Sequence, residues 1–135
     1  AYEQANNQLN QASQQYQAEI EAKAKEAEAL YKDYQKTASS LSAAQKSQKE
    51  EAIIAKEKEA AELRKKYFGP EGEMAKKQQV LINPIQDKIY EAVKQIAQQN
   101  GYDAVVDRSS AQSIIFASPR IDISNEVLSK LGYSN

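Results

Sequence analysis

Several residue types on which most enzymes and metal sites depend are missing from this sequence of 135 residues. It has no Cys, no His and no Trp. Without Cys there is no disulfide framework, no thiolate nucleophile and no cysteine metal site. Without His, the commonest general base and the commonest metal ligand are both missing. We therefore expect a protein that is not an enzyme and that binds no cofactor or metal ion.

Large apolar residues are also scarce, and they are unevenly distributed. Val, Ile, Leu, Met and Phe together make up only 26 residues, against 21 Ala and 16 Gln, which is too few for one compact core at this length. Residues 1–68 hold eight of the 26 and no Gly or Pro, whereas all four Gly and all three Pro come later. The sequence therefore combines two kinds of structure.

Neither charge nor hydropathy points to a nucleic acid or to a membrane span. The formal net charge is −1, from 18 basic and 19 acidic residues, so we expect no nucleic acid partner. No apolar run approaches the ~20 residues that a membrane span requires. The chain begins at Ala1 inside a helical pattern, with neither a helix cap nor a signal peptide, and we expect that a preceding segment has been removed.

The first half of the sequence predicts a long helical hairpin. Small hydroxyl residues interrupt the helical pattern near 37–43, where Ser40 or Ser42 is placed to cap a second helix. A stripe from Ile53 to Leu81 then recurs mostly every seven residues and is suited to pack back against the first helix. On the outer faces, a Glu precedes a Lys by four residues at four places, an order that stabilises a helix: Glu19/Lys23, Glu21/Lys25, Glu28/Lys32 and Glu62/Lys66. The outgoing stripe steps by three or four residues, with a stutter near Tyr16 to Ala24, through Tyr2, Ala5, Leu9, Ala12, Tyr16, Ile20, Ala24, Ala27, Tyr31, Tyr34, Ala38 and Leu41.

Some apolar residues of the hairpin exceed what a narrow seam can bury. Adjacent pairs occur at Leu30-Tyr31 and Ile53-Ile54, and one member of each pair is a candidate for contact with a bound partner, although a wider seam explains the pairs equally well. The candidate contact residues are Leu30, Tyr31, Leu41, Ile53 and Ile54.

Two interruptions follow the hairpin and are candidate hinges. The segment Gly69-Pro70-Glu71-Gly72 ends or bends the returning helix, and Pro84 is either a first-turn residue or a kink in the next one. That helix stops at Asn100-Gly101. The candidate hinge residues are Gly69, Pro70, Gly72 and Pro84.

The last third of the sequence predicts a small body with two strands. Residues 102–107 alternate like a half-buried strand, residues 113–117 form a second strand, and Ser124 is placed to cap a short final helix. Two strands alone are marginal in water, so the body should need a third strand, partner subunits, or both. We expect a mainly α chain of the α+β class, with a helical arm at 1–72 and a body at 73–135. The candidate core or interface residues of the body are Val105, Ile114, Phe116, Ile121, Ile123 and Leu128.

This ordered set of features resembles the Skp (OmpH) family of periplasmic chaperones. The resemblance is carried by the helix at 84–93, the blocks 102–107 and 114–116, and residues 122–131. It implies a jellyfish-like homotrimer, in which strands of three subunits form a body and three helical arms surround a cavity. It further implies an ATP-independent holdase of the periplasm that keeps unfolded outer-membrane β-barrel proteins from aggregating.

The sequence departs from the family pattern in two respects. Family members normally begin with a β-strand, which does not precede Ala1 here, and they are often strongly basic, whereas this chain is nearly neutral. The resemblance therefore leaves contact with a membrane or with lipopolysaccharide open. The alternative is a structural coiled-coil protein that spaces or joins components without chaperone activity. A prefoldin-like chaperone is disfavoured, because its strands lie between its two helices.

Overall fold

The computed structural model describes residues 1–133 and is mainly helical. The chain divides into two units, residues 1–81 and 82–135, and the division falls inside a helix. The helices are α1 (Tyr2–Thr37), η1 (Ala38–Ser40), α2 (Ala43–Phe68), α3 (Glu73–Asn100), η2 (Pro119–Ile121) and α4 (Ser124–Lys130). No helix among the described residues is both long enough and apolar enough to cross a membrane.

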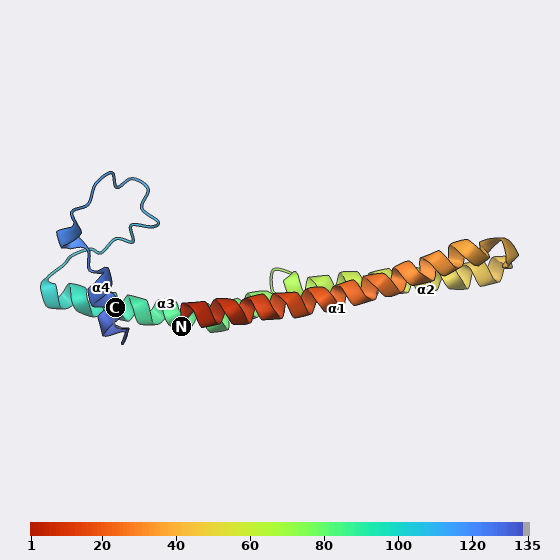
Figure 1. Ribbon diagram of the computed structural model, residues 1–135, viewed down its shortest axis with the longest axis horizontal. Coiled ribbons are helices and arrows are strands. Elements are labelled where there is room, and N and C mark those ends of the chain that lie inside the picture. The colour runs from red at the N-terminus through yellow and green to blue at the C-terminus, as the bar shows by residue number, and fades with distance from the viewer. Residues whose placement is uncertain (134–135) are drawn as a thin grey trace. The chain divides into compact units, whose positions relative to one another are not determined.

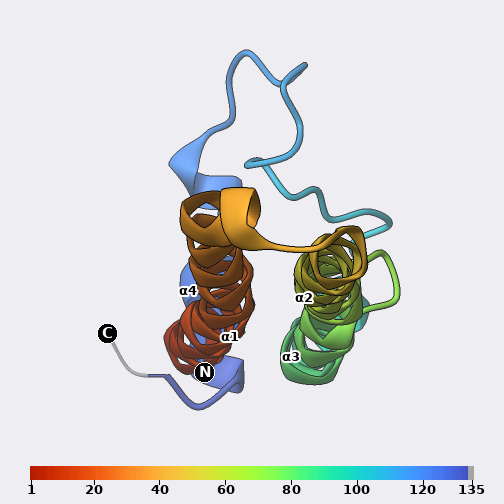
Figure 2. The same cartoon turned by 90° about the vertical axis from the view of Figure 1, so that its right-hand side faces the viewer.

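The first unit is a hairpin in which α1 and α2 lie side by side, as Figures 1 and 2 show. The chain reverses through η1, and Ser42 begins α2 with a capping box: Gln45 N donates to Ser42 Oγ over 3.2 Å, and Ser42 N donates to Gln45 Oε1 over 3.0 Å. Together these bonds satisfy two backbone donors that a helix start would otherwise leave free. The long helical hairpin of the predicted arm is confirmed.

The turn between α2 and α3 requires glycine at two positions. Gly69 N donates to Lys65 O over 2.9 Å, and a Cβ added at Gly69 would lie only 2.3 Å from that oxygen. A Cβ at Gly72 would lie 2.7 Å from Lys66 O. Gly69, Pro70 and Gly72 therefore form a close turn between the helices, whereas Pro84 lies inside α3 and the helix continues through it. Bending at these four positions stays a prediction.

The second unit contains the last part of α3, a long coil and α4. Ala92 and Ile96 of α3 are buried. Lys130 and Leu131, at the end of α4, line a shallow depression together with Asp87, Glu91 and Ala92, so the end of α4 lies beside this part of α3. The helix begins one residue earlier than predicted: Ser124, predicted as the cap, is its first residue, and the Asp122 carboxylate accepts a hydrogen bond from Ser124 N over 2.9 Å.

The two predicted strands are not present in the described part of this unit. Residues 102–118 form coil and turns, held by short-range bonds such as Ser110 N to Asp107 O at 3.2 Å and Ile114 N to Ala111 O at 3.2 Å. The alternating pattern is typical of a strand, but a lone segment is marginal in water, and no second strand among the described residues pairs with it. The side chains of Ile115 and Phe116 accordingly stay 98 % and 80 % exposed. The β-containing body that the sequence predicts is thus not present among residues 102–133.

Candidate functional site

The arm is held together by a narrow seam of small and medium apolar residues. The α1 members follow one another at steps of seven, eight and seven residues, and the longer step falls where the sequence predicted a stutter. Larger side chains are rare in the seam, so much of the outer surface of both helices is open to solvent. The buried apolar residues of α1 and α2 are Ala5, Ala12, Ile20, Ala27, Ile53 and Tyr67.

Of the four residues in the two adjacent apolar pairs, Leu30-Tyr31 and Ile53-Ile54, one lies in this seam and three are exposed to solvent. Ile53 is buried in the seam at 7 % exposure, whereas Ile54 beside it is 61 % exposed. Leu30 and Tyr31 are both exposed, and Leu41, after the reversal, is half-buried. Ile53 therefore belongs to the packing of the arm, and the candidate residues that a bound partner can reach are Leu30, Tyr31, Ile54 and part of Leu41.

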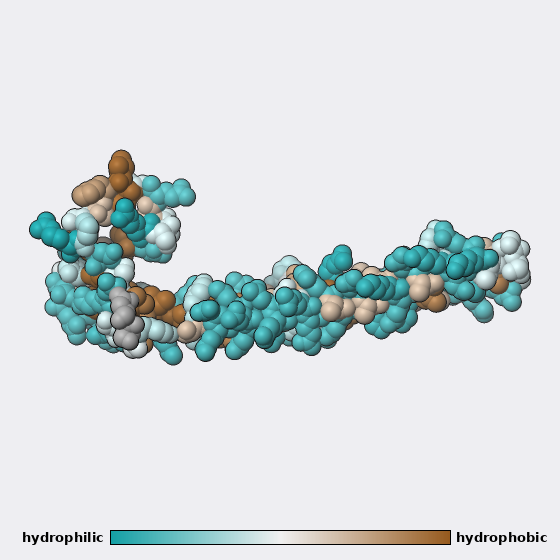
Figure 3. Space-filling model, in the orientation of Figure 1, coloured by the Kyte–Doolittle hydropathy of each residue, from teal (hydrophilic) through white to brown (hydrophobic). Residues whose placement is uncertain are grey.

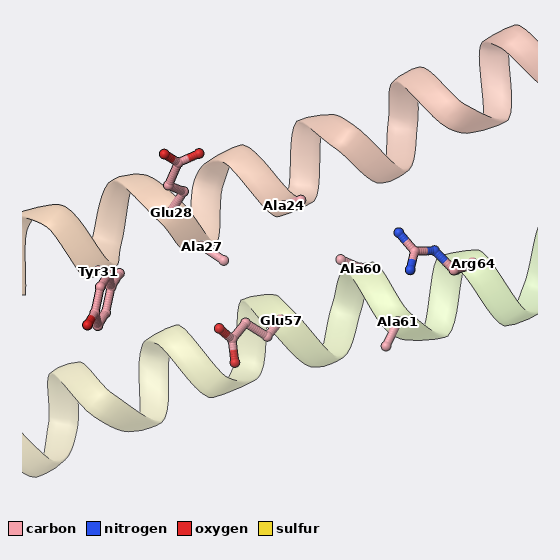
Figure 4. Close-up of a pocket in the computed structure, with 8 residues that line it drawn as sticks. All are labelled: Ala24, Ala27, Glu28, Tyr31, Glu57, Ala60, Ala61 and Arg64. Atoms are coloured by element: carbon pink, nitrogen blue, oxygen red, sulfur yellow. The ribbon is translucent and has the colours of Figure 1, made fainter.

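A groove of about 400 Å³ lies between α1 and α2 beside Tyr31. In Figure 4, Ala24, Ala27 and Tyr31 of α1 face α2, and Ala60 faces α1. Because alanine side chains are short, two helices that meet through alanines leave a hollow that leucines would fill. The groove is also lined by Ala61 and by the charged residues Glu28, Glu57 and Arg64.

On the same part of the arm, an ion-pair cluster joins the two helices. Lys56 lies 3.0 Å from Glu26 and 3.2 Å from Glu59, and Lys23 lies 3.6 Å and 3.5 Å from the same two carboxylates. The hydrogen bonds from Lys56 hold the pKa values of Glu26 and Glu59 below their ordinary range, and these bonds in turn raise the pKa of Lys56. Alternating charges thus bridge α1 and α2 across the hairpin, and as a network of four partly exposed groups they add modestly to the packing of the arm.

An aromatic cluster closes the arm at the end of α2. The rings of Tyr16 and Tyr67 stack with centroids 4.0 Å apart and planes 6° apart, and Phe68 meets Tyr16 edge-on at 6.3 Å. The Tyr67 hydroxyl donates to the Glu19 carboxylate, which raises the pKa of Tyr67 because a phenolate there would face a second negative charge. Tyr16 and Tyr67 thereby anchor α2 to α1 just before the glycine turn.

The candidate residues of the body are not assembled into a core by the single chain. Val105, Phe116, Ile121 and Leu128 are exposed, and Ile114 and Ile123 are half-buried. Exposed large apolar residues are more numerous in the second unit than in the first. They are Ile89, Tyr90, Tyr102, Val105, Val106, Ile115, Phe116, Ile121, Leu128 and Tyr133.

The sequence predicts some of these features and not others. The predicted pairs Glu21/Lys25 and Glu28/Lys32 form, at 3.0 Å and 2.6 Å. The other two predicted pairs do not, because Glu19 accepts from Tyr67, Lys23 pairs with Glu26 and Glu59, and Glu62 pairs with Lys58. The groove was not predicted either, although both apolar stripes carry alanines, which are too short to fill the space between the helices, at the positions that line it.

Comparison with known proteins supplies the family. No curated protein matches the chain. The family described as outer membrane protein (OmpH-like) matches residues 1–131, which is nearly the whole sequence and includes both the hairpin and the second unit. The matched range includes all of α1 and α2, the two helices of the hairpin. The chain belongs to the OmpH-like (Skp) family.

Proposed function

We propose that this protein is an ATP-independent holdase chaperone, which binds unfolded outer-membrane β-barrel proteins between helical arms and prevents their aggregation. Membership of the OmpH-like family supports the general class of an outer-membrane-protein chaperone. An unfolded barrel protein exposes apolar segments and unpaired strand edges, and enclosure keeps these from meeting a second chain. No catalytic step is part of this function.

The observation that carries the proposal is the exposure of Leu30, Tyr31 and Ile54 on a mostly polar arm. A spacer helix pair gains nothing from large apolar side chains in water, since they favour association with any apolar surface. Figure 3 shows small apolar patches spaced along the arm between broad hydrophilic regions. Such a surface offers several weak contacts, which suits a chaperone that must accept many sequences and release them again.

The second part of the proposal is that three chains assemble through residues 102–133. The exposed apolar residues of this segment, among them Ile115 and Phe116, give a single chain a reason to associate. Because residues 102–107 and 113–117 alternate like strands, we expect the subunits to associate through a sheet to which each chain contributes these segments. In this homotrimer Val105, Ile114, Phe116, Ile121, Ile123 and Leu128 would form the core or interface of the body.

The third part concerns compartment and motion. We place the protein in the periplasm of a Gram-negative cell envelope, where outer-membrane proteins pass unfolded; family membership supports this location. Bending at Gly69, Pro70, Gly72 and Pro84 would let the arms adapt to clients of different size. Comparison of arm angles between independent copies of the protein tests this: rigid superposition of every copy through these positions contradicts it.

A direct test dilutes a urea-unfolded outer-membrane β-barrel protein into buffer with the full-length chain and follows light scattering without nucleotide. We expect scattering to be suppressed. The triple variant Leu30→Ser, Tyr31→Ser, Ile54→Ser should lose most of the suppression, while the matched exposed control Ala22→Ser, Ala29→Ser, Ala55→Ser should keep it. Unchanged aggregation with the parent chain would favour a structural coiled-coil protein instead.

A further inference from the structure

We propose that one face of the arm is a binding track for an extended client segment whose apolar and polar residues alternate. The inference rests on the proposed holdase function and specifies what the arm recognises. The track comprises Ile54, Ala61 and Phe68 of α2, together with Tyr31 and Ala24 of α1.

Helix geometry places the α2 members of the track in one line. Ile54, Ala61 and Phe68 are separated by seven residues each, so they lie on nearly the same face of α2. All three are exposed to solvent, with Phe68 at 39 %. Ala61 lines the groove that Tyr31 and Ala24 also line, so the α1 residues open onto the same side of the hairpin. Large apolar side chains thus flank a hollow floored by small ones.

The length of this track corresponds to a short extended peptide. From Ile54 to Phe68 a helix rises about 21 Å, and a chain in the β conformation covers that distance in about six or seven residues. An extended segment points every second side chain to the same face. About four alternate apolar side chains therefore reach the track at once, the middle ones entering the groove.

The charges along the track favour a segment that carries both signs. Glu57 and Arg64 lie between the apolar members on the same face of α2, and neither forms an ion pair within residues 1–133. Most of the neighbouring charges are already paired, including Glu28 with Lys32 and the cluster around Lys56. Glu57 is therefore available to a basic residue of the client and Arg64 to an acidic one, about 10 Å apart along the helix.

The occupant that fits is a strand-like segment of an unfolded β-barrel protein. Strands of such barrels alternate apolar and polar residues over about ten positions, and they lack a partner strand until the barrel forms. An amphipathic helix would instead place its apolar residues three and four apart, on a convex surface that the narrow groove does not match. The track thus distinguishes a client by the period of its apolar residues.

The test measures binding of two fluorescent peptides of identical composition to the full-length chain. One peptide alternates Val and Tyr with Ser, Lys and Asp; the other places the same apolar residues three and four apart. We expect the alternating peptide to bind at least fivefold more tightly. Ala61→Gln and Ile54→Ser should each weaken its binding about fivefold, because part of its apolar surface returns to water. Val80→Ser, an exposed apolar control outside the track, should change binding less than twofold.

A second measurement does not depend on variants. In the parent chain with labelled alanine methyl groups, the alternating peptide should shift the resonances of Ala24, Ala60 and Ala61 through its tyrosine rings and leave those of Ala22 and Ala55 in place. Equal binding of both peptides, an equal loss in Val80→Ser, or unshifted groove methyls would overturn the track. If any of these three outcomes occurred while the parent chain still suppressed aggregation, the binding track would be refuted and the holdase function would stand. Loss of suppression in the parent chain would instead refute the holdase function.

Discussion

Ile53 and Ile54 are neighbours on α2 with the same side chain and opposite surroundings. Ile53 is 7 % exposed in the seam, and Ile54 is 61 % exposed on the outer face. Substitution of each by Ala removes the same atoms from the same helix. The pair therefore separates the packing of the arm from its contact with a client, without a difference in chemistry between the two variants.

The expected cost differs because only one of these side chains is removed from water. Three carbons at about 0.8 kcal/mol each, almost fully buried, give a loss of about 2 kcal/mol for Ile53→Ala before any cavity is counted. For Ile54→Ala the buried share gives about 1 kcal/mol. The higher helix propensity of Ala returns about 0.4 kcal/mol in both variants, which leaves about 0.5 kcal/mol for Ile54→Ala and about 2 kcal/mol for Ile53→Ala, where the cavity adds to the loss.

The assay is hydrogen exchange of the α2 amides, because the arm can open without unfolding the rest of the chain. We expect Ile53→Ala to speed exchange by about thirtyfold, which corresponds to 2 kcal/mol, and Ile54→Ala to change it by about twofold. In the aggregation assay the order should reverse, with Ile54→Ala the weaker holdase at a temperature where both arms stay helical. Equal exchange in the two variants, or a greater loss of client holding in Ile53→Ala, would refute this reasoning.

Three further outcomes are expected. The pKa of Tyr67 is raised by Glu19 from 10.0, so the stabilisation from their hydrogen bond is complete below pH 10.0 and is lost as the pH rises through the folded value. An alkaline titration of helix content should show this loss, and Tyr67→Phe should remove it. Lys56 lowers the pKa values of its two glutamate partners from 4.5, so its contribution is present above pH 4.5 and lost below it. The fall in the thermal midpoint between neutral pH and about pH 3 should be smaller in Lys56→Gln, as followed by circular dichroism. Gly101 has φ of 71° with no atom within 4 Å of an added Cβ, so Gly101→Ala should cost about 1–2 kcal/mol from backbone strain alone in urea denaturation.

The helical arm was predictable because its signals are local. Propensity, the three-and-four stripe, the hydroxyl residues near Ser42 and the absence of Gly and Pro before Gly69 all favour the same hairpin. The strands predicted at 102–107 and 113–117 are not present in the structure. A strand is stable only beside a second strand, and the local sequence does not specify that second strand. Local alternation predicts the residues that can form a strand, not the partner that makes it one.

The candidate site was predictable only in part. The pair Ile53-Ile54 marked an excess of apolar surface, but the choice of which member is buried follows from the register of α1 against α2. That register depends on long-range contacts such as the Tyr16–Tyr67 stack and the pairing of Lys56 with Glu26. Contacts between residues dozens of positions apart are not fixed by any local pattern. The groove could be inferred only after both stripes were set side by side.

In the proposed function, three copies of this chain enclose one unfolded outer-membrane protein. Native mass spectrometry of the full-length chain, mixed without nucleotide with a urea-diluted β-barrel client, tests this claim most directly. The account predicts a complex whose mass equals three chains and one client, together with a free trimer. A dimer that stays free of client at every concentration would contradict it.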